Sequence, residues 1–182
     1  MINITTARTR LRLIVLSDLD NIHQLLSFPE VDEYNTLGIP ADVDETKVII
    51  ESLIKANNAK EISNYTFVIE DKLDTEFIGL FGLKLWATKN RRGEVWYKLL
   101  PEKWNKGYAT EVLTTVINYG FETLHLHRIQ AGCAVENIAS IKVFEKVGMI
   151  REGRGRQILL LKSGWSDNFE YSILERDERK NV

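Results

Sequence analysis

The sequence contains few residues that cross-link or interrupt a chain: one cysteine and three prolines among 182 residues. A single cysteine, Cys133, excludes an internal disulfide bond and is typical of proteins from a reducing compartment. No apolar run approaches the roughly 20 residues that a membrane-spanning helix requires. The N-terminus also lacks the charged and then apolar layout of a secretory signal. We therefore expect a cytoplasmic protein that does not contact a membrane.

An excess of one charge is also missing, since 24 Lys and Arg stand against 26 Asp and Glu, a net charge of −2. This balance does not favour direct binding of nucleic acid. The charges are unevenly distributed, however: residues 18–51 are strongly acidic, whereas residues 84–106 are rich in Lys and Arg. A cationic ligand would be attracted to the first stretch and an anionic ligand to the second. Two solvated surfaces of opposite sign would give the same pattern.

The length of 182 residues is that of one domain and is sufficient to bury a sizeable core. Alternating or β-rich runs predict strands at residues 10–14, 65–70, 76–84, 94–100, 128–133, 154–161 and 169–174. Capping residues and helical spacing of apolar residues predict helices at about residues 18–26, 44–57, 109–124 and 137–148. The pattern predicts a single α+β domain over residues 1–182, with a mixed, mostly antiparallel sheet of about six to seven strands and about four flanking helices.

The most informative segment joins the strand at 94–100 to the helix that follows it. Gly107 lies in this turn, where the absence of a Cβ lets the backbone approach a ligand closely. The first amides of the helix point outward together, and the helix dipole favours negative charge beside them. We therefore predict that a pyrophosphate-bearing ligand binds a phosphate cradle, with Lys103 and Lys106 adding positive charge. The cradle consists of Asn105, Lys106, Gly107, Tyr108, Ala109 and Thr110. A Walker loop and the dinucleotide-binding fingerprint are excluded, because the glycines that they require are absent.

A second signature, NIASIKVFEKVGM, occupies residues 137–149. Together with WNKGYATE at residues 104–111, it resembles the GCN5-related N-acetyltransferases, which bind acetyl-CoA through a Gln/Arg-x-x-Gly-x-Gly/Ala motif. The likeness is greatest to the branch that acetylates the N-termini of ribosomal proteins. That branch shares TRLRL at 9–13, IGLFGL at 78–83, PEKW at 101–104, HRI at 127–129 and WSD at 165–167, in the same order. The resemblance implies the fold of that family, acetyl-CoA as co-substrate and no metal.

Three positions depart from the general motif. Trp104 stands where many members have Gln or Arg, as is usual for this branch. Asn105 stands where many relatives carry a glycine; its amide can still donate, but its backbone has less conformational freedom. Phe144 replaces a tyrosine that protonates the leaving thiolate in many members, so another group must supply that proton.

The resemblance also implies where the acetyl group is held and attacked. Two neighbouring parallel strands splay apart in this fold, so amides at Leu99 and Leu100 are expected to bind pantetheine and polarise the thioester carbonyl. Glu94 matches an acidic position that many relatives use as the general base, and it would act through a water molecule. Burial would raise the pKa of such a carboxylate and improve it as a base. Alternatively, Glu94 forms a strand-end ion pair with Arg91 or Arg92.

Ser140 is the candidate for stabilising or protonating the thiolate in place of Phe144. It lies one turn after Asn137, which is predicted to cap the helix, to contact pantetheine, or both. An ordinary role of Ser140 in the first turn of the helix also fits the sequence. Tyr34 and Trp165 lie in loops that relatives place near the acceptor, and we predict that both contact it.

We interpret the chain as an acetyl-CoA-dependent N-acetyltransferase that transfers an acetyl group to a primary amine by direct attack in a ternary complex. The favoured acceptor is the N-terminal α-amine of a protein or peptide. A small-molecule amine, such as a polyamine, an amino acid or an antibiotic, is the first alternative. A catalytically inactive acyl-CoA-binding module is the second, and Phe144 is its main support. We expect a monomer or a homodimer.

Overall fold

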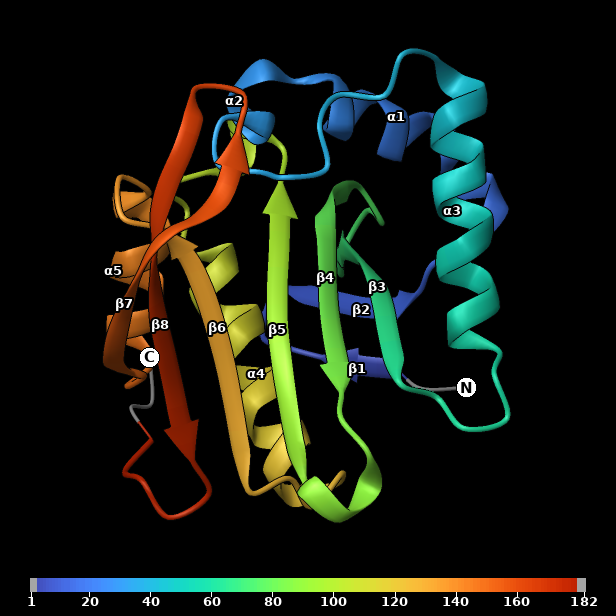
Figure 1. Ribbon diagram of the computed structural model, residues 1–182. Helices are drawn as coiled ribbons and strands as arrows, with labels where there is room; N and C mark the ends of the chain where they lie inside the picture. Colours follow the sequence, from blue (N-terminus) through green and yellow to red (C-terminus); the bar gives the residue numbers. More distant parts are fainter. Residues whose placement is uncertain (1–2, 180–182) are drawn as a thin grey trace.

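The computed structural model describes residues 3–179, which form one open sheet with helices on both faces (Figure 1). The strands are β1 (Asn3–Thr5), β2 (Thr9–Leu13), β3 (Asn64–Asp71), β4 (Phe77–Leu85), β5 (Arg92–Leu99), β6 (Arg128–Ala134), β7 (Ile150–Leu161) and β8 (Gly164–Leu174). The α-helices are α1 (Leu19–Ser27), α2 (Pro29–Asp32), α3 (Val43–Asn57), α4 (Tyr108–Glu122) and α5 (Ile138–Lys146). Short 3-10 turns lie at η1 (Leu16–Asp18), η2 (Thr88–Asn90) and η3 (Pro101–Lys103).

The strand order is β1-β2-β3-β4-β5-β6-β8-β7, and every neighbouring pair is antiparallel except β5 and β6. The predicted α+β class with a mixed, mostly antiparallel sheet is confirmed. All seven predicted strands are present, and β1 adds an eighth that is too short to leave a periodic pattern. The last two strands are longer than predicted, because shifts of register in β7 interrupt the alternation on which the prediction depended.

Helix ends follow local signals where a capping side chain has no competing partner. The Asp42 carboxylate accepts a hydrogen bond from the Glu45 N–H at 2.8 Å and starts α3. Asp18 occupies the N-cap position of α1, but its side chain makes no capping hydrogen bond. Asp18 instead binds the Arg12 guanidinium at 2.6 Å, so a tertiary ion pair takes the carboxylate that would have capped α1.

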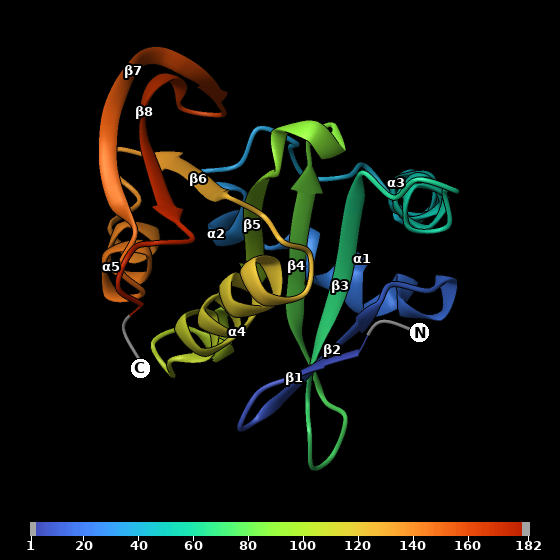
Figure 2. The same ribbon diagram turned by 90° about the horizontal axis from the view of Figure 1, so that it is seen from below.

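Two apolar layers hold the helices on the sheet, with α4 and α5 on one face and α1 and α3 on the other (Figure 2). The larger layer packs apolar side chains of α4 against the central strands, among them Val112, Leu113, Val116, Phe67, Phe81 and Ile129. The smaller layer packs α1 and α3 against β3 and β4 through Ile22, Leu25, Ile50, Val68 and Leu80. Burial of these apolar surfaces fixes β5 and the start of α4 in place.

The parallel strands β5 and β6 separate soon after they meet. Their pairing covers only Arg92–Glu94 against Arg128–Gln130. Beyond this point β5 pairs with β4 alone and β6 with β8 alone, and the two strands diverge toward their arrowheads (Figure 1). The splay that the family resemblance implied is therefore present. It leaves a gap in the sheet at the C-terminal ends of both strands, which we call the β5–β6 gap.

Candidate active site

The loop between β5 and α4 has the geometry of the predicted phosphate cradle, residues 105–110. Asn105 and Gly107 have positive φ angles of 58° and 82°, so the chain turns sharply before α4 begins at Tyr108. Asparagine tolerates this left-handed conformation better than most non-glycine residues, which explains how it can replace a glycine here. The first amides of α4 lack intrahelical acceptors, as in any α-helix, and Gly107 has no side chain to cap them, so they are open to an anion.

Arg8, in the turn between β1 and β2, supports this cradle from a distant part of the sequence. Its Nη1 donates to the Lys106 carbonyl at 3.0 Å, and its Nε donates to a Glu111 carboxylate oxygen at 2.6 Å. The guanidinium also lies 4.4 Å from the centre of the Tyr108 ring. Burial alone would raise the pKa of Glu111, but hydrogen bonds from Thr6 and Arg8 lower it, so the carboxylate stays ionised. Sequence reasoning missed Arg8, because nothing near it in the chain indicates that it contacts α4.

The two lysines assigned to the cradle have different environments. Lys106 is exposed in the loop. Lys103 is buried and forms an ion pair with Glu76. The prediction that Lys103 adds positive charge to the cradle is therefore wrong, since a carboxylate before β4 neutralises it. The basic residues at 84–92 lie at the far end of β5, an eight-residue strand that spans about 26 Å, so they do not contribute to the cradle either.

The end of β5 offers backbone amides to the β5–β6 gap. The Leu100 N–H donates to the Ile78 carbonyl at 3.0 Å. By the alternation of an antiparallel ladder, the N–H groups of Tyr97 and Leu99 then point away from β4 and toward the gap. Leu99 thus remains a candidate for binding pantetheine. The prediction for Leu100 is wrong, because Ile78 already takes its amide and its side chain is buried under α1 and α3.

Side chains from β5 and α5 meet beside the gap, on the face that α4 and α5 cover. The Tyr97 ring makes an edge contact with the Phe144 ring, with centroids 6.2 Å apart. Its hydroxyl is buried close to Ser140, but no polar group among residues 3–179 lies in normal hydrogen-bond geometry with it. Burial raises the pKa of Tyr97, and Ser140 offsets this only in part. Asn137 caps α5 as predicted, accepting from the Ser140 N–H at 3.0 Å.

Glu94 lies on the opposite face of β5, the face toward α1 and α3, because side chains alternate along a strand. Neither arginine considered as its partner binds it. Arg91 pairs with Glu175 at 2.8 Å, and the Arg92 guanidinium donates to the Gln130 side chain at 2.8 Å. The ion-pair alternative for Glu94 is therefore wrong in this structure, and the carboxylate remains a candidate base.

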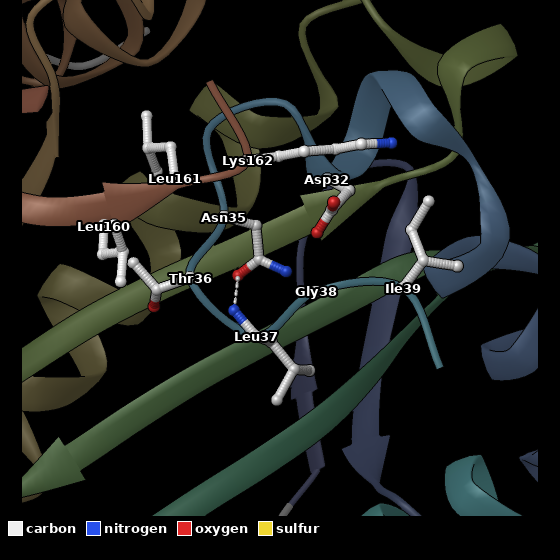
Figure 3. Close-up of a pocket in the computed structure, with 9 residues that line it drawn as sticks. All are labelled: Asp32, Asn35, Thr36, Leu37, Gly38, Ile39, Leu160, Leu161 and Lys162. Atoms are coloured by element: carbon white, nitrogen blue, oxygen red, sulfur yellow. Dashed lines mark hydrogen bonds between the residues drawn. The ribbon is translucent and has the colours of Figure 1, made fainter. Parts of the chain in front are cut away.

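Two adjoining pockets lie between the segment after α1 and the β7–β8 hairpin. The first, of about 410 Å³, is lined by Asp32, Asn35, Thr36, Leu37, Gly38, Ile39, Leu160, Leu161 and Lys162 (Figure 3). The second, of about 390 Å³, is lined by Glu33, Tyr34, Val135, Glu136, Arg154, Leu161, Ser163, Trp165, Ser166 and Asp167. The structure thus brings Tyr34 and Trp165 together in one pocket, which begins directly beyond the C-terminal end of β6.

Asp32 and Lys98 each have a buried polar atom that makes no hydrogen bond to the described residues. The Asp32 carboxylate points into the first pocket (Figure 3), and its Oδ1 has no hydrogen-bond partner within the described residues. The Lys98 ammonium is equally buried and unbonded. Burial lowers the pKa of Lys98 to about 8, although the charge of Asp32 acts in the opposite direction.

We expect the stability of the protein to rise with pH between about 8 and 10.5 because of Lys98. In this window the unfolded chain still binds the proton that the folded protein has lost, so the free energy of unfolding increases with pH. Relative to Lys98→Met, the wild type should gain on the order of 1–2 kcal/mol between pH 7 and pH 9.5, as measured by urea unfolding. An identical change in both proteins would contradict the assignment.

Two features are absent from residues 3–179: a metal site and a membrane-spanning helix. No group of three or more His, Cys, Asp or Glu side chains is placed to hold a metal ion. No helix is both long and apolar enough to cross a membrane. Cys133 is buried, and burial raises its pKa to about 11, which leaves the thiol protonated and a poor nucleophile.

Comparison with known proteins identifies the family. The family model described as the acetyltransferase (GNAT) domain matches residues 8–150. The chain belongs to the GNAT acetyltransferases.

The N-acetyltransferase YoaA of Bacillus subtilis (strain 168) is 32% identical over 173 residues, covering 95% of this chain and 97% of YoaA. The [ribosomal protein uS5]-alanine N-acetyltransferase of Escherichia coli (strain K12) is 35% identical over 70 residues, covering 38% of this chain and 36% of that enzyme. The spermidine N-acetyltransferase from Vibrio cholerae, solved in complex with CoA and spermine, is 26% identical with a TM-score of 0.81, covering 92% and 95% of the two chains.

The protein is therefore an N-acetyltransferase with the GNAT fold, and the family uses acetyl-CoA. Its residues fit that co-substrate at two separate places. The open amides at the start of α4 match the needs of a pyrophosphate. The unpaired edge of β5 at Leu99 and the unbonded Tyr97 hydroxyl offer polar groups along the gap where pantetheine would lie.

Arg8→Ala is expected to raise the Kd of acetyl-CoA about 10-fold, because the Lys106 carbonyl and Glu111 would lose charge-assisted hydrogen bonds that fix the cradle. Isothermal titration calorimetry would measure the change. Arg10→Ala is the matched control, since Arg10 lies in the same hairpin but pairs with Glu70. Equal Kd values for the Arg8→Ala variant and the wild type would show that the cradle does not depend on Arg8.

Proposed function

We propose that this GNAT enzyme acetylates the N-terminal α-amine of a protein or peptide by direct attack in a ternary complex. Acetyl-CoA supplies the activated acetyl group when bound. The cradle would hold its pyrophosphate through backbone amides, and the Leu99 amide would hold pantetheine in the β5–β6 gap. The acceptor would enter through the two pockets between the segment after α1 and the β7–β8 hairpin.

Polar groups in these pockets are the observation that favours a peptide acceptor. Lys162 lines the first pocket, and Arg154 lines the second, where it pairs with Asp167 at 2.6 Å. Both cations can donate hydrogen bonds to peptide carbonyl groups, which a polyamine lacks. A peptide brings a single α-ammonium group, which Asp32 could accept in the first pocket.

Exposed apolar side chains beside the pockets support the same proposal. Leu37, Leu160 and Trp165 are 54%, 58% and 61% exposed. The N-terminal side chains of a bound peptide would cover this surface. Tyr34 and Trp165, which are distant in sequence but line the same pocket, would both contact the acceptor. Burial of aromatic and aliphatic surface in this way is a common source of affinity for peptides.

The two candidate catalytic groups would act on different faces of β5. Glu94 faces α1 and α3 and would remove a proton from the incoming ammonium through a water molecule. Ser140 lies on the other face, beside the gap, and would help to stabilise the departing sulfur. This separation suits direct attack on the thioester carbonyl, because one group would serve the attacking amine and a different group would serve the departing sulfur.

A polyamine is the second candidate acceptor, because Glu33 and Glu136 line the same pocket and offer two carboxylates to a cation. The Vibrio cholerae relative named for spermidine also matches most of this chain. The pocket would need to select a flexible polycation despite Arg154.

Mass spectrometry of acetylated products tests both candidates. Purified protein and acetyl-CoA would be incubated with peptides that carry free N-termini, with the same peptides blocked at the N-terminus, and with polyamines and amino acids. Acetylation of the free α-amine alone is the expected result. Product only on polyamines or amino acids would refute the peptide acceptor, and binding of acetyl-CoA without any product would support an inactive module.

A further inference from the structure

The Tyr97 hydroxyl is the least explained polar group near the reaction centre. It is buried close to Ser140, but no residue between 3 and 179 lies in normal hydrogen-bond geometry with it. Buried hydroxyls without a partner are rare, because the group loses its bond to water and gains nothing in return. Such a group commonly marks the place of a ligand atom.

The position of Tyr97 indicates which ligand atom this is. The residue lies three positions beyond Glu94, the last residue of β5 that pairs with β6, and therefore beside the β5–β6 gap. Its neighbours across the gap come from β6 and α5: Cys133, Ser140 and Phe144. The side chain therefore lies beside the opening between the strands, on the face of β5 opposite Glu94.

We propose that the Tyr97 hydroxyl donates a hydrogen bond to the sulfur of acetyl-CoA and stabilises the thiolate as it leaves. This inference rests on the proposed acetyl transfer. The acceptor nitrogen forms a bond to the acetyl carbon, the carbon–sulfur bond breaks, and the electron pair passes to sulfur. The proton lost by the amine leaves through the Glu94 side, and the thiolate takes up a proton from solvent.

Tyr97 keeps its own proton throughout this step. Burial raises the pKa of Tyr97 above that of a free phenol, whereas an alkyl thiol has a pKa of about 8.5. Full proton transfer from the phenol to the thiolate is therefore unfavourable, and a hydrogen bond is the role that remains. Phe144 packs against the Tyr97 ring and carries no hydroxyl of its own, so Tyr97 supplies the donor that this position of α5 lacks.

Tyr97→Phe tests the proposal by removing one oxygen atom. We expect kcat to fall about 10- to 100-fold with little change in the KM of the acceptor, because a hydrogen bond to a developing charge is lost. The variant should unfold at the same temperature as the wild type or higher, since the missing hydroxyl has no partner in the folded protein. Tyr65→Phe is the matched control, a buried tyrosine of β3 outside the gap.

Binding of CoA and of desulfo-CoA gives a readout that packing would not change. In the wild type, CoA should bind more tightly than desulfo-CoA, and Tyr97→Phe should remove this difference while the Kd of desulfo-CoA stays the same. The double variant Tyr97→Phe/Phe144→Tyr moves the hydroxyl to the partner ring and should restore the difference.

Two results would overturn the proposal: a normal kcat in Tyr97→Phe, or an equal loss of affinity for both ligands. If the wild type binds CoA but transfers no acetyl group, the proposed function fails, and the comparison of the two ligands still decides whether Tyr97 contacts sulfur.

Discussion

Glu94→Gln is expected to lower kcat about 100-fold or more, while the Kd of acetyl-CoA stays unchanged. Glutamine keeps the size of the side chain but cannot remove a proton from the acceptor. Glu94 lies on the face of β5 toward α1 and α3, away from the cradle at the start of α4, so binding of the co-substrate should not depend on it. Steady-state kinetics with a saturating acceptor and calorimetry with acetyl-CoA would separate the two effects.

Glu51→Gln is the control for this substitution, because Glu51 is an exposed glutamate of α3 and the same charge is removed away from the site. The pH dependence of kcat for Glu94→Gln is a second test of whether Glu94 acts as the base. If Glu94 only deprotonates the incoming ammonium, activity of Glu94→Gln should recover as pH rises and the acceptor loses its proton in solution. Near-normal turnover of Glu94→Gln at neutral pH would remove Glu94 from the mechanism.

Gly107→Val is expected to raise the Kd of acetyl-CoA by at least about 10-fold. The φ angle of Gly107 is 82°, a conformation that β-branched residues avoid, and a Cβ would stand 3.4 Å from the Arg8 guanidinium. The backbone would have to move, and the amides at the start of α4 would lose their common direction. Calorimetry with acetyl-CoA measures the loss of affinity directly.

Gly38→Val controls for backbone strain, because Gly38 has the same φ angle of 82° but no atom within 4 Å of an added Cβ. Both variants should lose stability by a similar amount, since the strain is alike. Only Gly107→Val should lose affinity for acetyl-CoA. A similar loss in both variants would mean that general destabilisation, rather than the shape of the cradle, explains the result.

The residues that identify the family and the residues that would select the acceptor lie in different parts of the molecule. The features that identify the GNAT family lie in β5, the cradle and α5, and they concern the co-substrate that the family shares. The two pockets proposed to hold the acceptor are formed by the segment after α1 and by the β7–β8 hairpin. Relatives named for a ribosomal protein and for spermidine show that one fold serves different acceptors. The acceptor must therefore be decided by experiment on these pockets.

The sequence by itself determined the class of fold, most strands and the glycine turn before α4, because these depend on neighbours in the chain. Gly107 before an amphipathic helix and Asn137 at the start of α5 are local signals that the structure reproduces. Seven strands followed from alternation, while the three residues of β1 were too few to show any. The polar environment of individual side chains was not determined in this way.

Only the tertiary structure decided which partner each charged or polar side chain has. Lys103 lies beside the cradle in sequence but pairs with Glu76, and Arg8 supports the cradle from the first hairpin. Tyr97 lies in the strand predicted at residues 94–100, but the surroundings of its hydroxyl come from β6 and α5, which are distant in sequence. Electrostatic and hydrogen-bond energies depend on distances between atoms and on burial, which arise only when segments far apart in the chain pack together.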